Sequence, residues 1–111
     1  MNFKQKLIKK AEQINIQKEM DYIKRDMESY FSYRKYEIRL YKAHCCMAIG
    51  SKSGFNTNYA EFFVPDNVSG KEYTNLFITK LKELGFNSDK DISVEVIEQK
   101  EYDLYTITVR W

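Results

Sequence analysis

The stretch SGKEYTNLFITKLKELGF, residues 69–86, contains the start, the apolar face and the end of one amphipathic helix. Ser69 and Glu72 have the spacing of a capping box, in which the serine hydroxyl accepts a hydrogen bond from the Glu72 amide. Apolar residues recur at helical intervals, namely Tyr73, Leu76, Phe77, Leu81 and Leu84. Gly85 stands where a left-handed residue ends a helix. The sequence therefore predicts a helix over residues 69–85.

The residues that follow this helix change to a period of two. Apolar and polar side chains alternate in residues 92–96 and again in residues 105–111, which is typical of strands with one buried face. Residues 98–103 are polar enough for a turn, but they lack the Asn-Gly signature that would define the register. We predict a hairpin over residues 91–111 that packs on the preceding helix.

Length and composition indicate one globular domain. The chain has 111 residues, of which 43% are hydrophobic, and this is enough for a single modest core. We find neither a secretory signal nor an apolar run long enough for a bilayer, so we expect a cytoplasmic protein with no membrane partner. The two cysteines are adjacent and form no disulfide framework, which agrees with a reducing compartment.

The amino-acid composition indicates the type of source organism. Lysines outnumber arginines 14 to 4, and the abundant Lys, Asn, Ile, Tyr and Phe have A/T-rich codons. We therefore expect a low-GC bacterium, its phages or plasmids, or a parasite as the source.

The net charge of +2 is unevenly distributed. Residues 1–35 carry +4, residues 36–70 carry zero, and residues 71–111 carry −2. This asymmetry can steer an anionic partner, although a solvated basic helix explains it equally well.

The first segment, residues 1–31, has two apolar stripes at helical spacing. Phe3, Leu7, Ala11 and Ile14 form one stripe, and Ile16, Met20, Ile23, Met27 and Tyr30 form the other. The stripes are out of phase near Asn15, which indicates either one long helix with a stutter or a break between two helices. One helix would be about 45 Å long, more than the domain needs. We therefore expect the first dozen residues to project or to pack against another chain, including a homodimer through this helix.

Two basic stretches are candidates for partner binding. Four lysines precede the first acidic residue, and a basic amphipathic helix can bind a partner groove or a nucleic-acid backbone. Tyr33-Arg34-Lys35-Tyr36 interleaves aromatic and basic residues, the combination that holds single-stranded nucleic acid, although core and hinge roles also explain it. With one lysine from a glycine-rich loop, the candidate partner-binding residues are Lys4, Lys6, Lys9, Lys10, Tyr33, Arg34, Lys35, Tyr36 and Lys52.

Residues 36–64 are predicted to form a first hairpin. Residues 36–41 alternate, residues 43–49 are almost entirely apolar, and residues 59–64 form a returning strand. Gly50–Gly54 is interpreted as the hairpin loop. Phosphate binding by this loop is the alternative, but no helix follows to supply aligned amides.

Chemical motifs are weak along the whole chain. His44, Cys45 and Cys46 are adjacent, and neighbours on a strand point to opposite faces, so only His44 and Cys46 can share a side. The chain has no further His or Cys to complete a zinc site. Candidate acids stand in turn-like stretches where carboxylates meet water. We therefore expect no metal, no cofactor, no catalytic residue and no enzymatic activity.

These patterns lead to a fold hypothesis and two functional hypotheses. The fold is predicted to be α+β in the order α-β-β-α-β-β, with a mostly antiparallel four-stranded sheet and two helices packed on one face. The first functional hypothesis is a small accessory or inhibitory protein of a phage or mobile element, one that binds a host protein, for example to evade host defence. The alternative is a nucleic-acid-binding protein that uses the lysine-rich first helix and the Tyr33–Tyr36 junction, although a pI near 8.4 is low for that class.

Overall fold

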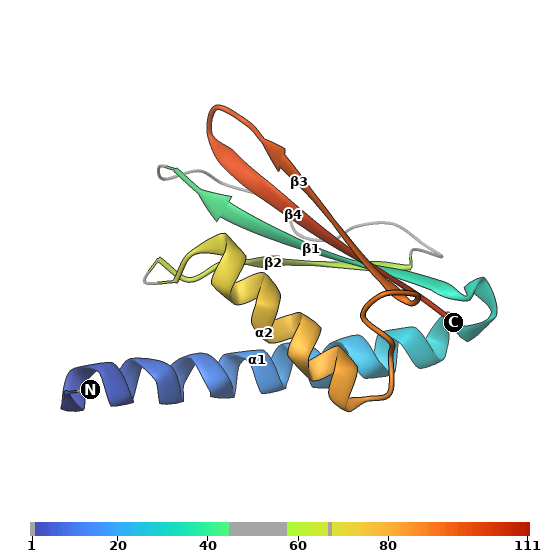
Figure 1. Cartoon of the computed structure of the whole chain (residues 1–111), viewed down its shortest axis with the longest axis horizontal. Coiled ribbons are helices and arrows are strands. Elements are labelled where there is room, and N and C mark those ends of the chain that lie inside the picture. The colour runs from blue at the N-terminus through green and yellow to red at the C-terminus, as the bar shows by residue number, and fades with distance from the viewer. Residues whose placement is uncertain (1, 45–57, 67) are drawn as a thin grey trace.

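A computed structural model of the chain describes residues 2–44, 58–66 and 68–111. The predicted α+β class is confirmed: the chain folds into two helices, the first of them long, and one four-stranded mixed sheet (Figure 1). In chain order the elements are α1 (Phe3–Ser29), the 3-10 turn η1 (Phe31–Tyr33), β1 (Lys35–Ala43), β2 (Tyr59–Phe63), α2 (Gly70–Glu83), β3 (Ile92–Glu98) and β4 (Tyr102–Arg110).

The sheet has the strand order β2-β1-β4-β3. β4 pairs antiparallel with both β1 and β3, whereas β1 and β2 are parallel. The predicted hairpin over residues 36–64 is therefore wrong, because parallel neighbours cannot be joined by a tight turn. Alternation of apolar residues identifies the buried face of a strand but not its direction. The predicted loop Gly50–Gly54 and the end of the predicted first strand lie outside the described residues.

Both helices cover the same face of the sheet (Figure 1). On that face the central strands bury Tyr36, Ile38 and Leu40 of β1 and Ile107 and Val109 of β4. α1 reaches this face through Asp26, which accepts a hydrogen bond from the Tyr36 hydroxyl. α2 reaches it at Gly70, where a Cβ atom would overlap the ring of Tyr105. The close approach of the first turn of α2 to β4 thus depends on the missing side chain.

α1 runs from Phe3 to Ser29 without a break, so the two predicted stripes belong to one helix. Its first turn is capped by Asn2, whose side chain accepts a hydrogen bond from the Gln5 amide over 2.9 Å. The second stripe of α1 is buried against the domain, at Ile16, Met20, Ile23 and Met27. The helix is therefore anchored by its second half.

The ends of α2 follow the local signals in residues 69–86. The Ser69 hydroxyl accepts a hydrogen bond from the Glu72 amide over 3.1 Å. At the other end Gly85 has a φ of 104°. The Phe86 amide then donates to the Leu81 carbonyl over 3.2 Å, which makes the ending a Schellman motif.

The turn between β3 and β4 has two central residues, Lys100 and Glu101. It is closed by the Gln99 amide, which donates to the Tyr102 carbonyl over 2.8 Å. The resulting register brings Val94 opposite Ile107 and Glu95 opposite Thr106. The register was the part of this hairpin that the sequence left open.

Candidate protein-binding surfaces

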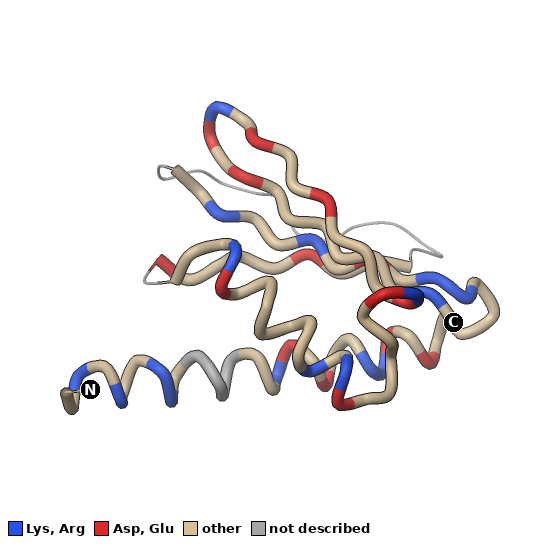
Figure 2. The backbone as a smooth tube through the Cα atoms, viewed as in Figure 1, with Lys and Arg blue, Asp and Glu red and all other residues tan. Residues whose placement is uncertain are grey.

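Residues 2–11, here called the N-terminal arm, comprise the Asn2 cap and the first turns of α1, and Figure 1 shows that α1 begins well away from α2. Near the end of the arm, Lys10 lines a cavity together with residues of α2. Two large apolar side chains of the arm are open to solvent, Phe3 at 74% exposure and Leu7 at 53%. All four candidate lysines of the arm are exposed as well, namely Lys4, Lys6, Lys9 and Lys10. Figure 2 shows these basic positions along the start of α1. The arm is thus a capped helix with apolar and basic side chains in solvent.

Two carboxylates fasten the second half of α1 to the domain. Glu19 accepts a hydrogen bond of 2.8 Å from the hydroxyl of Tyr73 in α2, and Asp26 accepts one from the hydroxyl of Tyr36 in β1. Because the two acids are seven residues apart, they lie on the same side of the helix. These contacts hold the part of α1 that follows the arm against α2 and β1.

Burial changes the protonation of this region. It raises the pKa of Glu19 from its ordinary value of 4.5 to about 7, although the hydrogen bond from Tyr73 acts in the opposite direction. Burial, together with the bond to Asp26, also raises the pKa of the Tyr36 phenol. Tyr36 therefore stays protonated and remains a hydrogen-bond donor to Asp26.

The aromatic and basic junction lies at the opposite end of α1 from the arm. A helix of 27 residues is about 40 Å long, so the two groups of candidate residues do not form one surface. Tyr33 is 47% exposed, and Arg34 adopts a left-handed backbone with a φ of 57°. The Arg34 side chain donates from Nε to the carbonyl of Trp111 over 2.8 Å, and the Trp111 amide donates back to the Arg34 carbonyl. Arg34 thus clamps Trp111, the residue after β4, to the connection between η1 and β1.

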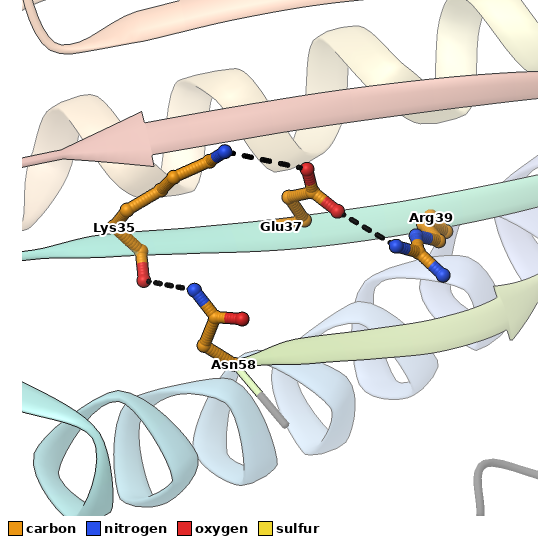
Figure 3. A network of polar contacts seen from close by, with 4 residues as sticks. All are labelled: Lys35, Glu37, Arg39 and Asn58. Atoms are coloured by element: carbon orange, nitrogen blue, oxygen red, sulfur yellow. Dashed lines mark hydrogen bonds and ion pairs between the residues drawn. The ribbon is translucent and has the colours of Figure 1, made fainter. Parts of the chain in front are cut away.

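Tyr36 is not a partner-binding residue, which corrects the prediction from the sequence. Its side chain is completely buried because it occupies the helix-facing side of β1. The ammonium group of Lys35 lies 3.8 Å from the Glu37 carboxylate, and its backbone carbonyl accepts a hydrogen bond from Asn58 over 3.0 Å (Figure 3). Lys35 thus contributes to the junction of β1 and β2. Lys52 lies outside the described residues.

An apolar cavity that the sequence did not reveal adjoins this clamp. It has a volume of about 340 Å³ and is lined by Lys24, Met27, Glu28, Phe31, Leu84, Phe86 and Trp111. Phe31 is 68% exposed beside it, and the Trp111 indole donates to the Phe31 carbonyl over 3.1 Å. The Schellman ending brings Phe86 here, to 6.4 Å between its ring centre and that of Trp111.

His44 of the His44-Cys45-Cys46 stretch lies within the described residues. His44 is exposed, and its two ring nitrogens face the Asp103 carboxylate at 3.1 Å and the Lys100 carbonyl at 3.2 Å. Both contacts tie the end of β1 to the β3–β4 turn. In residues 2–44, 58–66 and 68–111, no three His, Cys, Asp or Glu residues come together as metal ligands. Cys45 and Cys46 lie outside these ranges.

Comparisons of the chain with models of protein families, with curated proteins and with solved structures found no match in any of the three. Over the described part of the chain, neither helix has the length and apolar character that crossing a membrane requires. The candidate surfaces therefore rest on their own geometry.

Proposed function

We propose that this chain is a small non-enzymatic interaction module that binds a partner protein in the cytoplasm through the N-terminal arm. In biological terms it would be an accessory or inhibitory protein of a phage or mobile element that acts on a host protein. One observation carries the proposal: Phe3 and Leu7 are exposed on a helical segment that extends beyond the rest of the domain.

The spacing of these two side chains suits recognition of a helix by a groove. Phe3 and Leu7 are four residues apart, so they lie one above the other on one face of the helix. Complete burial of each side chain would contribute roughly 1.5–3 kcal/mol. Because Asn2 caps the arm and Glu19 fastens the same helix to α2, little conformational entropy is lost on binding.

The flanking lysines define what the partner groove should look like. Lys4, Lys6, Lys9 and Lys10 surround the apolar pair, and no acidic residue is present in the first turn. A second arm packed against the first would bring like charges together, which disfavours a homodimer through α1. An apolar groove with an acidic rim on another protein is complementary to both features.

Exchange of both apolar residues of the arm for glutamate is expected to abolish partner binding. We would compare wild type with Phe3→Glu/Leu7→Glu in quantitative capture from host lysate, followed by titration with the purified partner. A loss of more than tenfold in affinity is expected, because about 3 kcal/mol or more of apolar contact disappears. The control is Lys18→Glu, an exposed position beyond the arm. Equal capture by all three proteins would contradict the proposal, and a concentration-dependent dimer lost in the double variant would identify the homodimer instead.

A nucleic-acid backbone is the second candidate ligand for the arm, because four exposed lysines stand on one segment. This function predicts binding of single-stranded DNA or RNA that weakens steeply as salt rises. Lys6→Glu/Lys9→Glu/Lys10→Glu should then abolish binding, whereas Lys80→Glu/Lys82→Glu in α2 should not. Fluorescence anisotropy between 50 and 200 mM salt measures this directly. Lack of affinity for DNA and RNA at 50 mM salt would eliminate the nucleic-acid function.

A further inference from the structure

β3 forms one edge of the sheet, and its outer side is open. The strand pairs with β4 alone, over Ile92–Glu98. Among the described residues, none makes a backbone hydrogen bond to its outer side. Figure 1 shows β3 at the margin of the sheet, on the side opposite β2.

The alternation of the antiparallel ladder shows which residues point outward. The Arg110 amide donates to the Asp91 carbonyl, and the Gln99 amide donates to the Tyr102 carbonyl. Bonded and non-bonded pairs alternate along such a ladder, so the odd-numbered residues of β3 bond to β4. The even-numbered residues, Val94 and Val96 among them, direct their N–H and C=O groups away from the sheet.

The side chains of the same two valines line a groove. The groove has a volume of about 420 Å³, lies between α2 and β3, and is lined by Lys71, Thr74, Asn75, Ile78, Val94, Val96 and Tyr105. α2 packs over β4 and β1, and the part of β3 that follows the buried Ile92 is open. Val94 is therefore 43% exposed and Val96 49% exposed, although both lie on the helix-facing side of the sheet.

Natural edge strands are usually protected against pairing by charged side chains, above all lysine, or by a proline, a bulge or short length. The charges of β3 are two glutamates, Glu95 and Glu98. β3 has seven residues, contains neither lysine nor proline, and pairs with β4 without a bulge. In addition to the two valines, Ile97 is 39% exposed. The strand thus has both unpaired backbone groups and exposed apolar side chains, which are the features of a site for strand addition.

The acidic residues near this edge favour a basic strand of another protein over a second copy of the chain. Residues 92–103 contain four acidic residues and one lysine, and Figure 2 shows the acidic positions on the β3–β4 hairpin. Pairing of β3 with β3 of a second copy would place Glu95 and Glu98 of both copies on one short ladder. Like charges on facing strands are destabilising, so a strand from a different protein with basic residues fits better.

We propose that β3 accepts an extended segment of a partner protein as a fifth strand of the sheet. Residues of that segment opposite Val94 and Val96 would be apolar and enter the groove, and the residue between them would be Lys or Arg and lie beside Glu95. The proposal rests on the proposed function as a protein-binding module, but it uses a surface separate from the N-terminal arm.

A synthetic peptide tests this edge directly. The probe is an eight-residue peptide of alternating valine and lysine, acetylated, amidated and fluorescently labelled. Its control has the same sequence with N-methyl groups on alternate amides, which removes hydrogen-bond donors but keeps the charge. We expect the first peptide to bind at least tenfold more tightly, and to slow hydrogen exchange of the Val94 and Val96 amides in the full chain.

A proline substitution at each edge of the sheet provides a test variant in β3 and a control variant in β2. Val96→Pro removes an outward amide of β3 without breaking the ladder to β4. Directly after β2, the Val64 amide donates to the Tyr41 carbonyl, so the amide of the preceding Phe63 points outward. Phe63→Pro is therefore the corresponding control. Peptide affinity should fall about tenfold or more in Val96→Pro and stay unchanged in Phe63→Pro, with circular dichroism confirming that both variants fold.

The results of the peptide experiments distinguish failure of strand addition at β3 from failure of partner binding by the N-terminal arm. Equal binding of the methylated peptide, or unchanged affinity of Val96→Pro, would show charge attraction alone and overturn the proposal. Protection of the Val94 and Val96 amides without peptide, in a protein that sediments as a dimer, would make a second copy the occupant and also overturn it. The Phe3→Glu/Leu7→Glu variant should bind the peptide normally. Failure of the peptide alongside intact partner capture by the arm would end the strand proposal only.

Discussion

Replacing Phe77 by alanine is expected to lower the free energy of unfolding by about 3–5 kcal/mol. The ring is completely buried on the inner face of α2. It stacks on Phe62 at 6.1 Å between ring centres and meets the edge of Tyr73 at 5.4 Å. Removing it leaves a cavity between α2 and the sheet that these neighbours can fill only in part. Urea unfolding followed by circular dichroism measures the loss.

Phe63→Ala provides the matched control for this prediction. Phe63 is 51% exposed and belongs to the open face of the sheet, since it pairs with Tyr41. The same chemical change should there reduce stability by less than about 1 kcal/mol. Similar losses at the two positions would mean that the open face is as well packed as the helical face. That result would contradict the layer arrangement described above.

Glu19→Gln is expected to remove a pH dependence of stability and to stabilise the protein above pH 7. Burial raises the pKa of Glu19 from 4.5 to about 7. Between these values the folded chain retains a proton that the unfolded chain has released, so the free energy of unfolding falls as pH rises. A fully buried group would lose about 1.4 kcal/mol per unit of pKa. Because Glu19 is partly exposed, we expect about 1–2 kcal/mol after solvent screening.

Urea unfolding at pH 5, 6, 7 and 8 tests this expectation, with Glu28→Gln on the exposed side of α1 as the control. The hydrogen bond with the Asp103 carboxylate raises the pKa of the exposed His44, so His44 too contributes stability that is lost as pH rises. This contribution is common to all three proteins and cancels in their differences. A slope that is the same in Glu19→Gln and wild type would show that Glu19 does not titrate in this window.

Local signals in the sequence predicted the elements but not all of their partners. The start and end of α2 depend on Ser69 and Gly85, which act through the backbone nearest to them. The faces of β3 and β4 follow from alternation in the same way. The parallel pairing of β1 with β2 could not be predicted, because apolar alternation is the same in parallel and antiparallel strands.

The candidate sites show the same limit. The lysines of the arm were visible in the sequence because exposure follows from their chemistry. Tyr33 and Tyr36 belong to the same aromatic and basic stretch, yet the ring of Tyr36 is buried and that of Tyr33 is exposed. This difference depends on the register in which β1 pairs with β4. The groove beside β3 combines Ile78, Val96 and Tyr105 from three elements, and no local pattern relates them.

Pairing of β1 with β4 brings Lys35 opposite Arg110 and so joins residues that are far apart in the sequence. Closing so long a loop has an entropic cost that local contacts do not recover, and a topology of high contact order folds slowly. During synthesis β1 must wait for residues 102–110, and at about 5–20 residues per second this delay lasts several seconds. Throughout that interval the edge of β1 that later pairs with β4 has no partner strand. The growing chain should therefore depend on chaperones more than its small size suggests.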